Sequence, residues 1–547
     1  MLLLVAGIAS AAHIKIYVLT GQSNSLGTTN GKETDKSPGS DPADAQVKFW
    51  WQNWASATTS LGNCTNKIVP LLVQQGGYYA GSATHWGPEF GFGRALWKAG
   101  QRDFMIVKCS RGSGGNSFWH KPAADHHMYD KVRNAVSNAV TALTNQGHTF
   151  EVVGLLYLQG EGNSSTEAAE AGTRFRLLLD NLRADLPNAS RMRGHIAGII
   201  NSGMVPDVTG TTRAQHDAVY GQYAPEIMFF SDLDLRREMV PDNLHFNVRG
   251  KLCIGARFAD AVLGRWASYN ADLVATNAQS PVFQGWLETA PSAINGQAVA
   301  GSSPDPGFTN NAWMIDDASA AARGYYYTRQ FSSNQCSWAS GVGWKLTASS
   351  RLVTNYSGSR AWVMQYGDAV NRWLLWAEVD TNNQLVTSWD KDAVTLAARS
   401  VVVQSNHDGG YHEFTLEQGG GTSAGAVLFD GQAVGSLLPI PAIGDLPLGV
   451  HWGTFSTNGT VKSHWQRVDF TLGSFSVSGV RVNASNRFQL QFPTRTSHAY
   501  GVFRSTNFLD WSSLTTNVTG TGIEVSYTDT NALLSVAPVV YRVRMYP

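Results

Sequence analysis

The chain has 547 residues. Because a single hydrophobic core stops growing at about 250–300 residues, we expect two or three domains. Apolar residues make up 43% of the chain and charged residues 15%, with 55 glycines and 18 tryptophans, a composition that argues against extended disorder and favours β-rich domains. The 41 Lys and Arg side chains balance the 41 Asp and Glu side chains, so the positive surface that binds a nucleic-acid backbone is missing. We therefore expect no nucleic-acid partner.

The N-terminus begins with the short apolar sequence MLLLVAGIASAA. Its small residues at the end are of the kind that signal peptidase accepts, so residues 1–12 are predicted to be the signal peptide of a secreted or periplasmic protein. No Lys or Arg precedes the apolar run, and a truncated start or a buried strand remains the alternative. No other stretch approaches the roughly 20 apolar residues of a transmembrane helix, which predicts no membrane span.

Residues 13–275 alternate short apolar runs with helical patterns, as β-α units do when they build a parallel sheet. The expected strands, each short and rich in aliphatic or aromatic residues, are 14–19, 104–108, 152–158, 195–200 and 227–231. The clearest helix is expected at 173–186, where apolar residues form one stripe before Pro187. Further helices are expected around 132–143 and at 247–263.

Beyond residue 275 the pattern changes to alternating strands separated by Gly, Asn and Ser turns. We expect an all-β sandwich at 282–473 and a small β-sandwich module at 474–547. The four cysteines are scattered without C-x-x-C spacing, so neither a zinc ribbon nor a disulfide scaffold is expected, although one disulfide remains possible.

Polar residues follow several of the expected strands in the first domain. Ser23 follows the first strand within Gly-Gln-Ser-Asn, and a glycine-rich loop that includes Gly115 follows the second. Gln159-Gly160-Glu161 follows the third strand, and Asp242-Asn-Leu-His245 precedes the last helix. Taken alone, each segment is typical of an ordinary loop. Because the carboxyl ends of parallel strands share one edge of a sheet, the segments are expected to meet there.

Asp and His three residues apart can place an imidazole against a serine while the carboxylate fixes the imidazole tautomer. A glycine-rich loop and a carboxamide can supply N–H donors to an oxyanion. In this chain order, the four segments resemble the SGNH hydrolase superfamily. The motifs GQSN, GPE, QGE and D-x-x-H resemble its acetylesterase branch, which holds sialate O-acetylesterase-like proteins and acetylxylan esterases of carbohydrate esterase family 6.

The resemblance covers about residues 14–265 and implies a flavodoxin-like three-layer α/β/α domain with a parallel sheet. It implies that Ser23 is the nucleophile, His245 the base and Asp242 the residue that orients the histidine. It also implies that oxyanion donors come from the Ser23 backbone, from Gly115 and from Gln159. The family often has an acid two residues after Q-G-E, where this chain has Asn163, so the contact made by that acid is in doubt.

The predicted activity is removal of O-acetyl groups from carbohydrate through an acyl-enzyme, with no cofactor and no metal. Substrate contacts are expected from Asn24, Asn116, Trp119 and Glu161, although a structural role for Glu161 is the more common one. His126 and His127 are adjacent and would not face one metal ion on a helix, so they are interpreted as exposed. The loop after Ser23 is polar, which favours a sugar substrate over a lipid.

Two other functions stay open: a lipase or thioesterase on the same fold, and a catalytically inert carbohydrate-binding protein. Residues 282–472 resemble a concanavalin-type or laminin-G sandwich, and the terminal module resembles small β-sandwiches appended to bacterial secreted hydrolases. Several aromatic residues of the sandwich could stack on sugar rings, but a core role is the more common one (Trp286, Trp313, Tyr325, Tyr326 and Tyr327). The sequence does not indicate which sugar or hydroxyl carries the acetyl group, nor the oligomeric state.

Overall fold

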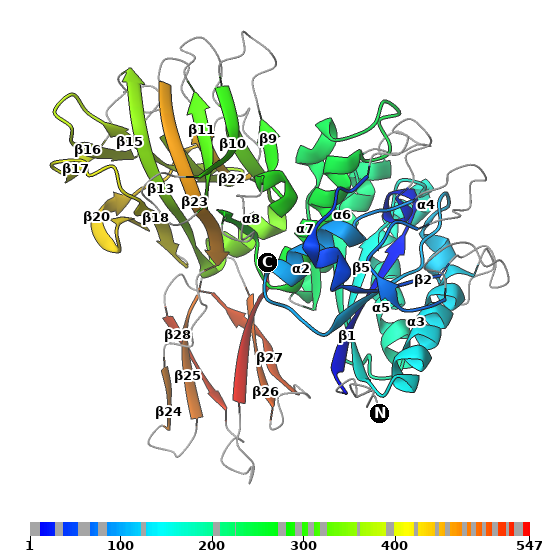
Figure 1. The fold of residues 1–547 in the computed structure, drawn as a ribbon. Coiled ribbons are helices and arrows are strands. Elements are labelled where there is room, and N and C mark those ends of the chain that lie inside the picture. The colour runs from blue at the N-terminus through cyan, green and yellow to red at the C-terminus, as the bar shows by residue number, and fades with distance from the viewer. Residues whose placement is uncertain are drawn as a thin grey trace, which may run out of the picture. The chain divides into compact units, whose positions relative to one another are not determined.

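The computed structural model describes most of the chain, and two compact units can be distinguished in it (Figure 1). The first unit contains Met1–Gly264 and Val282–Gly285, and the second contains Arg265–Pro281 and Trp286–Pro547. The three expected domain ranges remain a prediction. The described residues are all except 1–10, 28–36, 53–65, 75–84, 122–126, 201–207, 225, 272–279, 290–297, 305–310, 318–324, 358–361, 390–398, 421–424, 443–447, 455–459, 473–478, 483–487, 495–498, 506–511, 521–523, 530–539 and 547.

The predicted signal peptide lies almost entirely outside the described residues. Within the described part of the chain, no helix is long and apolar enough to cross a membrane.

The first unit is built on a seven-stranded sheet with the order β3-β2-β4-β1-β5-β6-β7. Its strands are β1 (His13–Gly21), β2 (Lys48–Trp51), β3 (Val69–Pro70), β4 (Phe104–Lys108), β5 (Thr149–Leu158), β6 (Arg193–Ala197) and β7 (Ile227–Phe230). All five expected strands are confirmed. The sheet is parallel from β2 to β7, but β3 pairs antiparallel with β2, so the expectation of a wholly parallel sheet is wrong at that edge.

Helices accompany this sheet: α1 (Ser23–Leu26), α2 (Glu89–Lys98), α3 (Met128–Asn145), α4 (Ser165–Ala169), α5 (Ala171–Asp185), α6 (Val208–Tyr223) and α7 (Val248–Val262). Tyr17 of β1 packs edge-on against Phe92 of α2, and Tyr157 of β5 packs against Phe175 of α5. Tyr157 is in register with Thr20, whose side chain points to the face opposite Tyr17. The helices therefore cover both faces of the sheet, as Figure 1 shows.

The local sequence explains where these helices begin and which side they bury. Ser164 begins α4 with a reciprocal pair of hydrogen bonds to Glu167, and the Asn247 side chain caps α7 by accepting from the Gly250 N–H. The predicted stripe of α5 is buried, as its periodicity indicated.

The second unit contains two eight-stranded antiparallel sheets. The first contains β8 (Ala267–Asn270), β10 (Ala298–Pro304), β11 (Asn311–Asp317), β13 (Gly343–Ser357), β18 (His412–Gly419), β19 (Gly425–Phe429), β20 (Gln432–Leu437) and β23 (Thr460–Leu472). The second contains β9 (Leu287–Thr289), β12 (Tyr326–Gln330), β14 (Trp362–Gly367), β15 (Asn371–Val379), β16 (Leu385–Trp389), β17 (Arg399–Gln404), β21 (Ile440–Pro441) and β22 (Gly449–Thr454). One helix, α8 (Ser333–Val342), precedes β13.

The C-terminal strands form two three-stranded sheets, β24-β25-β28 and β27-β26-β29. Their bounds are β24 (Gly479–Val482), β25 (Phe488–Pro493), β26 (Ala499–Ser505), β27 (Ser512–Thr519), β28 (Glu524–Asp529) and β29 (Val540–Tyr546). Leu490 and Phe492 of β25 form a buried core with Tyr500 and Val502 of β26. This small core gives the last strands an apolar centre that joins the two sheets.

Most aromatic residues considered for sugar stacking lie in the core of the second unit. Trp286 and Tyr327 are fully buried, Trp313 and Tyr325 are at most 8% exposed, and only Tyr326 is partly accessible. The Tyr327 ring lies 4.8 Å from the ring of Trp452. These contacts support the core role rather than sugar stacking. Cys109, Cys253 and Cys336 are buried and form no disulfide with one another, and Cys64 lies outside the described residues.

Candidate active site

A sharp turn between β1 and α1 presents Ser23. Gly21 has φ +141°, and a Cβ atom there would lie 1.9 Å from the Leu158 carbonyl oxygen of β5, so this position requires glycine. Ser23 is the first residue of α1, where backbone N–H groups have no acceptor within the helix. Its side chain is partly accessible, whereas Asn24 beside it is buried. The turn thus exposes one hydroxyl at the carboxyl edge of the sheet.

Ser23, His245 and Asp242 are brought together in one hydrogen-bonded series. His245 Nε2 lies 2.8 Å from Ser23 Oγ, and His245 Nδ1 lies 2.8 Å from Asp242 Oδ2. A carboxylate accepts the Nδ1–H, which leaves Nε2 with a lone pair toward the hydroxyl. His245 is only 3% exposed. Ser23 and His245 are 222 positions apart in the chain, and they meet because both lie at the carboxyl edge of the sheet.

Asp242 is held as an acceptor by its own loop. Its Oδ1 accepts hydrogen bonds from the backbone N–H groups of Leu244 and His245, at 2.8 and 2.9 Å. Burial raises the pKa of Asp242, but hydrogen bonds from the His245 side chain and from these two N–H groups outweigh it, so the pKa lies below its ordinary value. The carboxylate therefore stays ionised and fixes the orientation of the imidazole.

The other polar residues of Gly-Gln-Ser-Asn connect the serine turn to neighbouring loops. Gln22 Oε1 accepts from the N–H groups of Gly160 and Gly162, at 3.0 and 3.1 Å. Asn24 Nδ2 donates to Glu161 Oε1 at 2.7 Å and to the Leu244 carbonyl at 3.0 Å. The Phe246 N–H donates to Asn24 Oδ1 at 3.0 Å, so Asn24 ties the loop that carries the histidine to the serine turn.

Asn24 and Glu161, two of the residues considered as substrate contacts, bond each other inside the protein, which supports the structural role expected for Glu161. Asn24 is 2% exposed and Glu161 is 4% exposed, and each is bonded to the other. Burial raises the pKa of Glu161, while the Asn24 hydrogen bond acts in the opposite direction. Both side chains are buried next to the reactive serine turn, and their hydrogen bonds hold the neighbouring loops in position. The sequence motif identified Asn24 as a candidate but did not indicate which groups it hydrogen-bonds.

Gln159 is fully buried and its carboxamide is oriented by two neighbours. Its Nε2 donates to Asn163 Oδ1 at 2.7 Å, and its Oε1 accepts from the Tyr157 hydroxyl at 3.2 Å. Asn163 Oδ1 also accepts the Asn116 N–H at 3.0 Å, and its Nδ2 donates to Thr212. A carboxamide nitrogen carries two hydrogens, so Gln159 keeps a second N–H. Asn163, which the sequence showed only as a departure from the family pattern, holds both Gln159 and the glycine-rich loop.

The glycine-rich loop packs closely against α4. A Cβ atom on Gly115 would lie 2.0 Å from the Glu167 carboxylate, so a larger residue there would have to displace that side chain. Asn116 is 3% exposed and donates from Nδ2 to the Glu167 carbonyl, and Trp119 is 1% exposed and donates from Nε1 to Thr20. Both side chains point into the protein, and the expected substrate contacts of Asn116 and Trp119 stay a prediction.

A buried ion pair stabilises the turn that carries Ser23. Glu89 Oε2 and Lys108 Nζ lie 2.8 Å apart, and both side chains are fully buried. Lys108 also donates to the Leu26 carbonyl at the end of α1, at 3.0 Å. Glu89 Oε1 accepts from Gln74 and from the Gly87 N–H. The glutamate of the Gly-Pro-Glu motif is therefore part of the architecture that holds the serine turn.

The first unit is thus an α/β unit with a Ser-His-Asp cluster at the carboxyl edge of its sheet. Residues 13–264, just under half of the chain, match the family model for carbohydrate esterases described as sialic acid-specific acetylesterase. The resemblance predicted from the motifs is confirmed for this part of the chain, and the family match indicates a carbohydrate acetylesterase. No curated protein matches the chain.

Solved structures with similar parts include a protein from Arabidopsis thaliana, at 20% identity over 46% of this chain and 98% of that one, with a TM-score of 0.35. NanS is 17% identical over 47% of this chain and 98% of its own, with a TM-score of 0.32. A carbohydrate acetylesterase from Xanthomonas citri is 13% identical over 73% of this chain and 77% of its own, also at 0.32. At these scores, the function rests on the family match and the site geometry.

Proposed function

We propose that residues 13–264 are an SGNH-type serine esterase with a three-layer fold, and that it removes O-acetyl groups from carbohydrate through an acyl-enzyme. The observation that carries the proposal is the pair of 2.8 Å contacts that join Ser23, His245 and Asp242. The central strand order β4-β1-β5-β6-β7 supports it, because Ser23 follows β1 where the order reverses. Doubly wound sheets bind ligands at that position.

The proposed mechanism follows from which group holds the proton at each step. His245 Nε2 accepts the Ser23 proton as Oγ attacks the acetyl carbonyl, and Asp242 stabilises the resulting imidazolium. The imidazolium then donates its proton to the sugar oxygen as the bond from that oxygen to the acetyl carbon breaks, so the sugar leaves with a free hydroxyl. Water attacks the acetyl-enzyme with the same histidine as base, which releases acetate and restores the serine.

The proposed oxyanion donors are the Ser23 N–H, the Gly115 N–H and the second N–H of Gln159. Donors held in place before reaction stabilise the developing charge without reorganisation. Asn163 supports this assignment for Gln159, because it fixes the carboxamide in one orientation. The remaining N–H can then act on the tetrahedral intermediate.

The test is hydrolysis of p-nitrophenyl acetate by Ser23→Ala. We expect kcat to fall on the order of 10⁶-fold, as for loss of a triad serine in other hydrolases. Ser25→Ala is the matched control: Ser25 lies on the same turn, is buried, and bonds Ser110 at 2.7 Å. It is expected to keep most of the activity. Near-native turnover by Ser23→Ala, with contaminating esterase excluded, would refute the nucleophile assignment.

The sugar is identified by acetate release from a panel that holds acetylated xylan, O-acetylated sialic acid and an algal polysaccharide. Release from none of them, together with hydrolysis of longer acyl esters, would favour the lipase or thioesterase alternative.

We also propose, from the sequence alone, export to the periplasm or the medium and a tethering role for a concanavalin-like second unit. Proteolytic processing near residue 12 and polysaccharide pull-down test these two points.

A further inference from the structure

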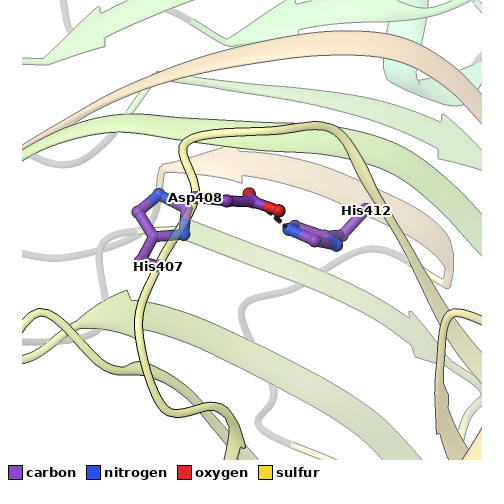
Figure 2. Close-up of side chains that lie close together, drawn as sticks. All are labelled: His407, Asp408 and His412. Atoms are coloured by element: carbon purple, nitrogen blue, oxygen red, sulfur yellow. Dashed lines mark hydrogen bonds and ion pairs between the residues drawn. The ribbon is translucent and has the colours of Figure 1, made fainter.

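A second cluster of chemically reactive side chains lies in the second unit, where the loop after β17 meets the first residue of β18. It consists of His407, Asp408 and His412, and the Asp408 carboxylate points toward His412 (Figure 2). One ligand atom from each of the three residues, a ring nitrogen or a carboxylate oxygen, lies within 4.8 Å of the other two. The loop leads from one large sheet of the unit to the other, since β17 and β18 belong to different sheets. The cluster therefore sits where the chain crosses over.

A carbonyl group fixes the tautomer of His407. Its Nε2 lies 3.1 Å from the Leu352 carbonyl oxygen of β13. A carbonyl only accepts hydrogen bonds, so Nε2 carries the proton and Nδ1 keeps a lone pair. Nδ1 is buried and has no hydrogen-bond partner among the described residues. A buried acceptor with no donor is costly unless something fills its place.

A carboxylate fixes the tautomer of His412 in the matching way. His412 Nδ1 lies 2.8 Å from Asp430 Oδ2, at the turn between β19 and β20. Asp430 Oδ1 accepts the Glu413 N–H at 2.8 Å, which holds the carboxylate in place. With Nδ1–H donated to Asp430, the lone pair of Nε2 faces Asp408 Oδ1 at 3.2 Å. A lone pair against a carboxylate is unfavourable unless a proton or a cation lies between them.

We propose that His407 Nδ1, His412 Nε2 and the Asp408 carboxylate form a binding site for a divalent transition-metal ion, with Zn²⁺ the best match. Two imidazoles and one carboxylate form a common zinc ligand set that leaves a fourth position for water. The Leu352 carbonyl and the Asp430 carboxylate supply the outer hydrogen bonds that orient such histidines. Ca²⁺ is disfavoured, because it takes 6–8 oxygen ligands.

To bind zinc, the three ligand atoms, which lie within 4.8 Å of one another, would have to reach tetrahedral spacing. Ligands about 2.0–2.1 Å from a tetrahedral ion lie roughly 3.3 Å apart. His412 and Asp408 already have that spacing, at 3.2 Å. Gly409 and Gly410 follow Asp408, and Gly409 has φ +72°, so the turn that brings Asp408 back toward His412 uses a conformation open to glycine. An occupied site would join the crossover loop to β18.

The experiment uses the full-length protein, stripped with a chelator and titrated with ZnCl₂ in a calorimeter. We expect one zinc site per chain and a rise in unfolding temperature with Zn²⁺ but not with Ca²⁺. His407→Ala and His412→Ala should lose the site, and Asp430→Asn should raise Kd by about 10–100-fold because it disturbs only the outer partner. Circular dichroism checks that each variant folds.

His127→Ala is the matched control. Its side chain is 60% exposed and its Nδ1 lies 3.9 Å from an Asp130 oxygen, so it offers a histidine beside a carboxylate without a built site. We expect its zinc binding to equal that of the wild type. The proposal is overturned if the wild type binds no zinc, if Ca²⁺ binds more tightly, or if His407→Ala binds as the wild type does. The first result would leave His412 as a bridge between Asp408 and Asp430 without a metal ion.

Discussion

Replacing His216 with phenylalanine should make the first unit less sensitive to acid. His216 lies on α6, is 1% exposed, and is surrounded by the rings of Tyr157, Phe175 and Phe229 at centroid distances of 6.3–6.5 Å. Neither ring nitrogen has a hydrogen-bond partner among the described residues. Burial lowers the pKa of His216 from 6.5 to about 3. A phenyl ring suits this aromatic surrounding and cannot be protonated.

The sign and size follow from proton linkage. The folded state binds a proton at His216 less readily than the unfolded state, so its contribution to stability is complete above the unfolded pKa of 6.5. That contribution is lost as the pH falls from 6.5 toward 3. Each pH unit in this window costs about 1.4 kcal/mol, which gives about 2 kcal/mol at pH 5. Burial also lowers the pKa of His195 to about 3, so the wild type should lose stability from two sites.

The assay is urea unfolding at pH 7 and at pH 5, followed by circular dichroism at 222 nm, because α1–α7 lie in the first unit. We expect the difference in unfolding free energy between His216→Phe and the wild type to shift by about 2 kcal/mol in favour of the variant at pH 5. Any packing change cancels in this comparison. The exposed His127→Gln should show no such shift. If the difference in unfolding free energy between His216→Phe and the wild type is the same at pH 7 and at pH 5, the reasoning is refuted.

Three further outcomes are expected. Asp242→Asn should lower kcat by about 10⁴-fold, because the histidine loses its tautomer partner; a loss below tenfold in p-nitrophenyl acetate assays would contradict this role. Asn163→Ala should lower kcat by up to ~10²-fold at nearly constant KM, because the Gln159 carboxamide loses its anchor, and an unchanged kcat would contradict that assignment. Lys108→Met should cost about 3–5 kcal/mol in urea unfolding because it leaves Glu89 charged and buried, whereas the double variant with Glu89→Gln should cost less than the two single changes together; additive losses would argue against the ion pair.

The strands of the first unit and the reactive segments at their ends could be read from the sequence. Short aliphatic runs and helical stripes reflect local periodicity, which depends on residues close in the chain. The motif residues Ser23, Asp242 and His245 were identified from short motifs, after the first strand and before the last helix, and from the family resemblance that those motifs carry. The core role, which is the more common one for such aromatic residues, also holds for most of those considered in the second unit.

The side-chain partners could not be read from the sequence. Asn24 and Trp119 have the chemistry of sugar contacts, but direction depends on the neighbouring strands, and both point inward to partners far along the chain. The contacts of Asn163 with Gln159 and with the glycine-rich loop could not be predicted either. They exist because β5 lies between β1 and β6 in the sheet, which brings the loop after β5 close to the glycine-rich loop.

Local pattern and motif are enough to predict the elements and the reactive residue types. Which donors and acceptors meet depends on contacts between distant parts of the chain. The spacing His407-Asp408 with His412 is visible in the chain, yet Leu352, which fixes one tautomer, lies on β13, and Asp430, which fixes the other, lies at the turn between β19 and β20. Hydrogen bonds act over about 3 Å, and the strands that bring those atoms within reach are ordered by the sheet and not by the chain.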